Sequence, residues 1–147
     1  MPRLTWCLLG FVLVGMVAGA AEDQPLQLYV QLIRATNNER PASPDWKAAG
    51  PRVKACLSPA FGWKNYWQVS LQEVSVQHGK ATKASLTPGR RLEINRVGDN
   101  VIELRLFHRE QLSRSIRHPL SRKMAITGWE IERKEAGFVV VRREKPQ

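Results

Sequence analysis

The residues with the clearest chemical potential in this sequence are arginines in its C-terminal half. Residues 90–145 contain 14 lysines and arginines but only 8 acidic residues. Several fall on three neighbouring predicted strands and their turns: Arg105, Arg109, Arg114, Arg117, Arg122 and Lys123. Because guanidinium presents a rigid fork of donors, arginine favours bidentate contacts with phosphate or carboxylate groups. The pattern predicts a basic face that binds a polyanion; a generally basic, soluble surface is the alternative.

The other reactive residue types form no recognisable catalytic or metal-binding set. The sequence has no G-x-S-x-G, H-E-x-x-H, C-x-x-C, phosphate-loop or dinucleotide motif. His108 and His118 could share a metal with Cys56 across a hairpin, but separate surface histidines are the more ordinary interpretation. Ser113 and Ser115 resemble the nucleophile of a hydrolase only in composition. We therefore expect no cofactor and no metal.

Residues 1–20 have the composition of a secretory signal. Arg3 supplies the positive start, residues 6–17 are mostly apolar, and the small residues 18–20 fit a cleavage site. An uncleaved membrane anchor is the alternative, but the apolar stretch is shorter than the ~20 residues that span a bilayer. We therefore expect cleavage after residue 20 and export to the periplasm or the cell exterior. The mature chain, residues 21–147, would then have no transmembrane segment.

The mature chain has a length that suits one β-rich domain. It keeps one cysteine, Cys56, so it has no intrachain disulfide and depends on its core for stability. We expect this thiol to be buried among apolar residues, with pairing to another chain as the alternative. The net charge of +10 favours an acidic partner. An acidic envelope polymer, an anionic membrane surface or an acidic protein fits export better than nucleic acid does.

The arginines must be positioned by strands, because most of the chain alternates with period two. Residues 26–35 alternate and predict a half-buried strand. The aromatic run at residues 61–77 predicts the central strand, with Trp67 in the core and with Trp63 and Tyr66 partly exposed. We expect the run to organise the rest of the domain.

A loop and a short helix separate these two predicted strands. Residues 36–50 are rich in turn formers and predict a loop. Pro51 suits the first position of a helix, and Pro59 predicts that the helix ends within two or three turns. Val53, Cys56 and Leu57 lie at helical spacing and predict one buried stripe.

The C-terminal half predicts a series of hairpins. Turn signals occur at Pro88-Gly89, at residues 98–100 and at Arg109-Glu110. The predicted strands are residues 81–87, 91–97, 101–108, 112–118, 124–126, 129–134 and 138–142, with glycines at 128 and 137 between the last three. Residues 112–118 also fit a helix. The pattern predicts a mainly β fold, an antiparallel β-sandwich or open barrel of about seven or eight strands with one short helix near its start.

Two parts of the chain carry a resemblance to a known family. They are the strand that begins at residue 138, with the sequence FVVVRR, and the aromatic run with its flanking polar residues, Phe61, Trp63, Lys64, Asn65, Tyr66 and Trp67. With the short helix and the hairpins, they resemble a family of small, exported, uncharacterised bacterial β-rich proteins. The resemblance implies export and a β fold, and it implies no activity.

The sequence therefore predicts a non-enzymatic envelope domain that binds another macromolecule through its basic face. The alternative is a hydrolase that acts on a cell-wall or other polyanionic substrate. A deep pocket that brings Glu or Asp together with His would favour the hydrolase.

Overall fold

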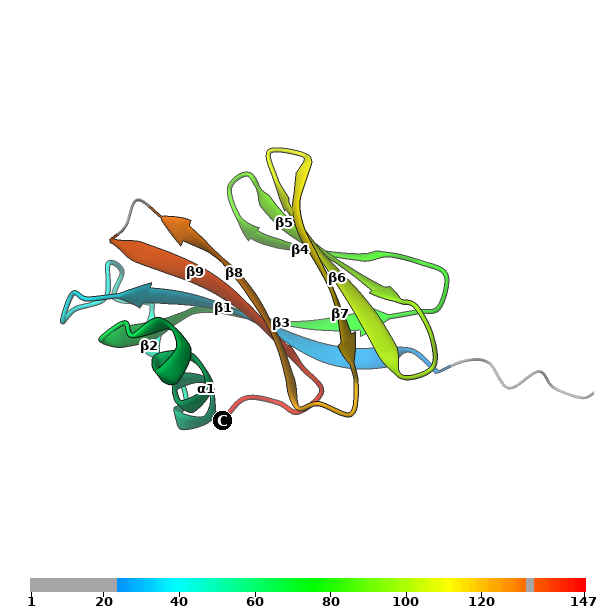
Figure 1. Ribbon diagram of the computed structural model, residues 1–147, viewed down its shortest axis with the longest axis horizontal. Helices are drawn as coiled ribbons and strands as arrows, with labels where there is room; N and C mark the ends of the chain where they lie inside the picture. The colour runs from blue at the N-terminus through cyan, green and yellow to red at the C-terminus, as the bar shows by residue number, and fades with distance from the viewer. Residues whose placement is uncertain (1–23, 132–133) are drawn as a thin grey trace, which may run out of the picture.

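The computed structural model describes residues 24–131 and 134–147. The expected signal segment and part of the expected strand at residues 129–134 lie outside the described residues. Within them, the chain forms two antiparallel sheets and one helix (Figure 1). The prediction of a mainly β sandwich is confirmed. No helix in the described ranges has the length and apolar character needed to cross a membrane.

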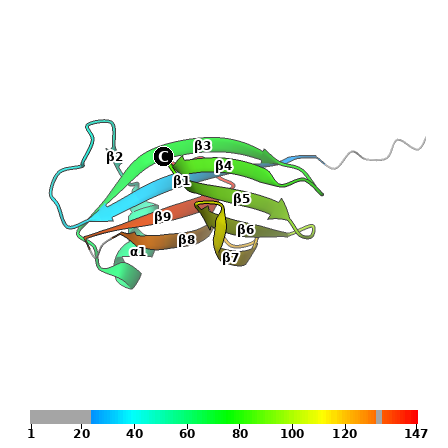
Figure 2. The same cartoon turned by 90° about the horizontal axis from the view of Figure 1, so that it is seen from above.

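The larger sheet has the strand order β2-β3-β1-β9-β8, and the smaller sheet has the order β4-β5-β6-β7. The strands of the larger sheet are β1 (Leu26–Thr36), β2 (Lys47–Ala48), β3 (Asn65–Val76), β8 (Met124–Ile131) and β9 (Glu135–Arg142). Those of the smaller sheet are β4 (Thr82–Thr87), β5 (Arg90–Arg96), β6 (Val101–His108) and β7 (Gln111–Pro119). The helix α1 (Pro51–Phe61) lies at one end of the larger sheet, away from the smaller sheet (Figures 1 and 2).

Two apolar layers hold these elements together. One lies between the sheets and includes Leu28, Leu92 and Leu104. The other lies between the larger sheet and α1 and includes Ile33 and Leu57. Strands β1 and β9 contribute to both layers, so both of their faces are buried. The continuous apolar run at residues 138–142 predicts a strand buried on both faces, and this is confirmed. The prediction that β1 is only half-buried is wrong.

The central strand of the larger sheet is β1, not the aromatic strand β3. The pairing of β3 with β1 shifts between Leu32 and Ile33, which leaves Val69 as an extra residue in β3. Such a bulge moves the following side chains to the opposite face. Tyr66 is therefore buried on the helix side, whereas Trp67 is only half-buried and Leu71 is exposed. The predicted core position of Trp67 and the predicted exposure of Tyr66 are wrong.

Helix α1 has eleven residues, so the predicted length of two to three turns is confirmed. It continues through Pro59 to Phe61, however, so the prediction that Pro59 cannot lie inside it is wrong. The proline has no N–H, so the carbonyl group of Ala55 receives no helical hydrogen bond from it.

The helix ends at Gly62, which has a φ of 68° and donates its N–H to Ser58 at 3.1 Å. Only Val53 and Leu57 of the predicted stripe are buried. Cys56 is exposed, contrary to its predicted burial.

The glycines at 128 and 137 lie inside β8 and β9 and do not separate strands as predicted. Gly128 lies directly opposite Phe138, and Gly137 lies directly opposite Trp129. A Cβ atom at residue 137 would lie 2.3 Å from the indole of Trp129, and one at residue 128 would lie 2.7 Å from the Phe138 ring. Each glycine therefore leaves room for an aromatic ring on the neighbouring strand.

The predicted hairpins of the smaller sheet are confirmed. Gly89 has a φ of 79° in the β4–β5 turn. Arg109 and Glu110 have φ values of 49° and 64°, the positive pair that a tight two-residue hairpin turn requires. The ambiguous residues 112–118 belong to strand β7, which pairs with β6 along its whole length.

Candidate functional site

The structure divides the predicted arginine cluster between two faces of the smaller sheet. Arg105 lies opposite Ser115, and Arg117 lies opposite Glu103, so all four side chains share the outer face. Arg105 lies 3.9 Å from a carboxylate oxygen of Glu93, and Arg117 lies 3.6 Å from one of Glu103. The charges of these two arginines are therefore balanced locally.

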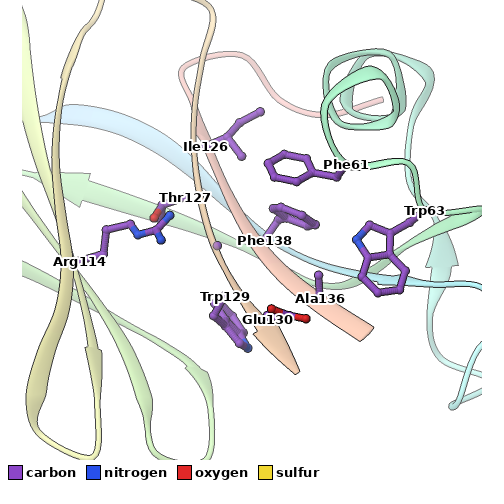
Figure 3. A pocket seen from close by; sticks show the side chains of 10 residues that line it. Phe61, Trp63, Arg114, Ile126, Thr127, Trp129, Glu130, Ala136 and Phe138 are labelled. Carbon is purple, nitrogen blue, oxygen red and sulfur yellow. The ribbon is translucent and has the colours of Figure 1, made fainter. Parts of the chain in front are cut away.

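Arg114 lies on the other face, opposite the buried Leu106. Arg117 is three positions after Arg114, and an odd separation places two side chains on opposite faces of a strand. The prediction that Arg105, Arg114 and Arg117 belong to one basic face is therefore wrong. Figure 3 shows Arg114 directed toward β8.

Arg114 lines a mostly aromatic hollow, which we call the aromatic pocket. It lies beside β8, between β7 and the end of α1, and has a volume of about 320 Å³ (Figure 3). Its lining is Phe61, Trp63, Arg114, Ile126, Thr127, Gly128, Trp129, Glu130, Ala136 and Phe138. Neither Arg114 nor Glu130 forms an ion pair with another described residue. The pocket can hold an apolar group, but its lining brings no acid–base pair together.

The turn of the β6–β7 hairpin carries Arg109, and its neighbour Glu110 neutralises the adjoining surface. Arg91 donates to both carboxylate oxygens of Glu110 at 2.8 Å and to Glu93 at 3.2 Å. The hydrogen bond from Arg91 lowers the pKa of Glu110 below its usual value. The guanidinium group of Arg91 also lies 4.5 Å from the centre of the Phe107 ring. On this surface Arg91 is therefore paired with two carboxylates of its own chain.

The remaining predicted cations, Arg122 and Lys123, lie in the turn between β7 and β8. They share a hollow of about 430 Å³ with Arg143 and Glu144 of the C-terminal tail. A second hollow of about 160 Å³ shares Glu144 with the first and is also lined by Arg52, Arg142 and Lys145, among others. We call these residues the basic end: Arg52, Arg122, Lys123, Arg142, Arg143, Lys145 and Glu144.

The basic end gathers six cations around one carboxylate from three separate segments. Figure 1 shows the β7–β8 turn beside the first part of the tail, which then runs to α1. Arg52 donates a hydrogen bond to the carboxylate of Glu144 at 3.0 Å and forms an ion pair with it. Both side chains are largely exposed, so this pair contributes little stability. Burial, and then the nearby Arg52, lower the pKa of Arg142. The basic end therefore holds six cations against the one side-chain carboxylate of Glu144.

The predicted reactive residues do not assemble. His108 lies opposite Gln111 and His118 lies opposite Ile102, so these two histidines do not face each other across the hairpin. Ser113 donates to the backbone oxygen of Leu106 at 3.0 Å. The residues that the structure describes contain no cluster of three His, Cys, Asp or Glu side chains suited to a metal.

Comparisons with protein-family models, with curated proteins and with solved structures found no match for this chain. The resemblance to small exported β-rich proteins therefore stays a prediction. The function must be inferred from the basic end and the aromatic pocket.

Proposed function

We propose that this chain is a non-enzymatic binding domain whose basic end takes an acidic polymer. The single observation that carries the proposal is the gathering of six cations around Glu144. Like charges repel, so such a grouping is unfavourable for the free protein and favourable once a polyanion is bound. Four of the six cations are arginines, which suits bidentate contacts with carboxylate, sulfate or phosphate groups.

The shape of the basic end favours a polymer over a flat membrane surface. Its two hollows adjoin at Glu144, so successive anionic groups along one chain can each enter a hollow. Membrane-surface binding usually adds apolar side chains that enter the lipid. The large apolar side chains that the structure leaves exposed, Phe61, Leu71, Val97 and Leu112, line neither hollow. The hydrolase alternative is favoured by no observation on the described residues.

The triple variant Arg122→Glu, Lys123→Glu, Arg143→Glu is expected to weaken binding to an acidic glycan such as polygalacturonate by roughly tenfold or more. Binding by the parent should fall as salt rises from about 20 to 150 mM, because ions screen exposed charges. Isothermal titration at several salt concentrations measures both effects.

The matched control is Arg105→Glu, Arg109→Glu, Arg117→Glu, which changes the net charge by the same amount on the outer face of the smaller sheet. This control should retain most of the affinity, because two of its three arginines are already balanced by glutamates. Equal losses in the two variants would mean that only net charge matters, and the proposal would then be wrong.

We also propose that the protein is exported and that residues 1–20 act as a signal that is removed on export. The ligand would then be an acidic polymer of the cell envelope. Mass spectrometry of the protein recovered from its host should show Ala21 as the first residue. A variant with Ala18→Arg and Ala20→Arg should remain unprocessed. Recovery of the parent from the cytoplasm with Met1 still attached would refute this part of the proposal.

A further inference from the structure

Arg142 is a buried cation for which the described residues provide no oxygen acceptor. Its side chain is 8% exposed and lies on the helix-side face of β9, opposite Met124 and Tyr29 of the neighbouring strands. The guanidinium Nη1 donates to the sulfur of Met124 at 3.8 Å, and Nε has no hydrogen-bond partner. Sulfur is a weak acceptor, and a buried charge without a good partner is costly. An anion at this position would remove that cost.

The start of α1 presents unsatisfied donors to the same place. Gly50 precedes the helix in an extended conformation and provides no side-chain cap. The first turn contains no acidic residue, and its second position is Arg52. The first N–H groups of a helix have no partner within the helix, and the aligned peptide dipoles favour a negative charge beside them. Pro51 has no N–H and Lys54 donates to Gly50, so the free donors of this turn are the N–H groups of Arg52 and Val53. These donors are typical of anion sites at helix starts.

The two features meet in one small hollow. Its lining includes residues 50–53 of the helix start, the side chain of Arg142, and Lys145 of the tail. The amide of Gln31 also lines the hollow; its Nε2 atom donates to Gln68 at 2.7 Å, and its Oε1 atom, which has no partner among the described residues, is an acceptor and does not contribute to anion binding.

Glu144 is the acidic side chain of this lining, and its carboxylate accepts a hydrogen bond from Arg52. Gln147 also lines the hollow, and its backbone oxygen lies beside Gly50, 3.3 Å from the place a Cβ atom would take there. At about 160 Å³ the hollow suits one small group and excludes a bulky one.

We propose that this hollow, which we call the anion seat, binds one oxyanionic group between the guanidinium of Arg142 and the first turn of α1. A carboxylate, sulfate or phosphate group has the oxygen acceptors that both sets of donors require. Arg52 and Lys145 would then lie at its rim. The inference deepens the proposed function, on which it rests for the source of the anion: the seat would hold one anionic group of the polymer.

Sulfate is the probe for the seat itself. We expect sulfate to shift the backbone amide signals of Gly50, Arg52 and Val53 saturably in a two-dimensional NMR titration, with chloride adjusted to keep the ionic strength constant; Pro51 has no amide proton. Arg142→Gln should weaken sulfate binding by roughly tenfold or more. Arg143→Gln is the matched control, because it removes the neighbouring, exposed charge and leaves the seat intact. Arg142→Lys keeps a charge but loses the fork, so its affinity should fall between the two.

Circular dichroism checks that each variant is folded, and Arg142→Met replaces Arg142→Gln if the glutamine variant is not. The inference is overturned if the parent shows no saturable response to sulfate, or if the Arg142 and Arg143 variants respond alike. The polygalacturonate titration separates the two proposals. Saturable sulfate binding without glycan binding would support the seat and refute the proposed function. Glycan binding that weakens equally in both variants, without a sulfate response, would support the proposed function and refute the seat.

Discussion

Replacing Phe138 with alanine is expected to lower the free energy of unfolding by roughly 3–5 kcal/mol. The Phe138 ring is 4% exposed, belongs to the apolar layer between the larger sheet and α1, and covers Gly128. Its removal leaves a cavity between β8, β9 and α1 that backbone atoms cannot fill without moving. Urea unfolding followed by circular dichroism measures the loss.

Phe61→Ala is the matched control, because the rings of Phe61 and Phe138 lie 4.6 Å apart. The side chain of Phe61 is 52% exposed, so its truncation should cost about 1 kcal/mol or less. Equal losses from the two variants would contradict the assignment of Phe138 to the core and of Phe61 to its edge. The Phe61 variant should also widen the aromatic pocket, since Phe61 lines it.

Gly137→Ala is expected to destabilise the domain by about 1–3 kcal/mol, although alanine is normally the better residue inside a strand. The added Cβ atom would lie 2.3 Å from two carbon atoms of the Trp129 indole, so the ring must move. Trp129 packs against the layer between the sheets and also lies 4.4 Å below the guanidinium of Arg90. Its displacement therefore disturbs the core and a cation–π contact together.

A double-mutant cycle with Trp129→Ala isolates this effect. With the indole removed, Gly137→Ala should cost much less, because the new methyl group then meets no ring. The coupling between the two substitutions should therefore be about 1 kcal/mol or more. Strictly additive losses would show that the clash between residue 137 and the indole is not the cause.

The regular hairpins of the smaller sheet could be predicted from the sequence. In β5 and β6 an apolar residue recurs at every second position, and Leu92, Ile94 and Ile102 are buried as this period predicts. Each of these strands pairs with its neighbour in the chain, and the turn between them sets the register. Local sequence therefore contains most of the information that this sheet requires.

The errors in the larger sheet have one physical cause, which is pairing between distant segments. The bulge at Val69 changes which face of β3 is buried, and it is defined only by the register with β1. In the sequence, Gly128 and Gly137 predict the ends of strands, because the aromatic rings that cover them belong to the neighbouring strand and are not adjacent in the chain. The central place of β1 likewise depends on β9, which the local pattern of residues 26–35 cannot reveal.

Only some residues of the basic end could be predicted from the sequence. Arg122 and Lys123 were identified from composition, and both line the basic end. The position of Arg114 on the opposite face from Arg117 follows from their odd separation and could have been predicted. Arg52 and Arg142 could not, because a helix start and a strand end meet there only in the folded chain.

The position of β1 between β3 and β9 also bears on the order in which the chain is made. Among the described strands, β1 is the first to be synthesised and β9 is the last, and Arg34 and Glu135 meet across 101 residues. Until β9 exists, β1 has one unpaired edge, and the two apolar layers lack Val139, Val140 and Val141. Contacts this distant in the sequence close slowly, because a long loop must be ordered first. The nascent chain is therefore expected to stay unfolded until its synthesis is almost complete, which is the state in which a protein threads through a narrow translocation channel.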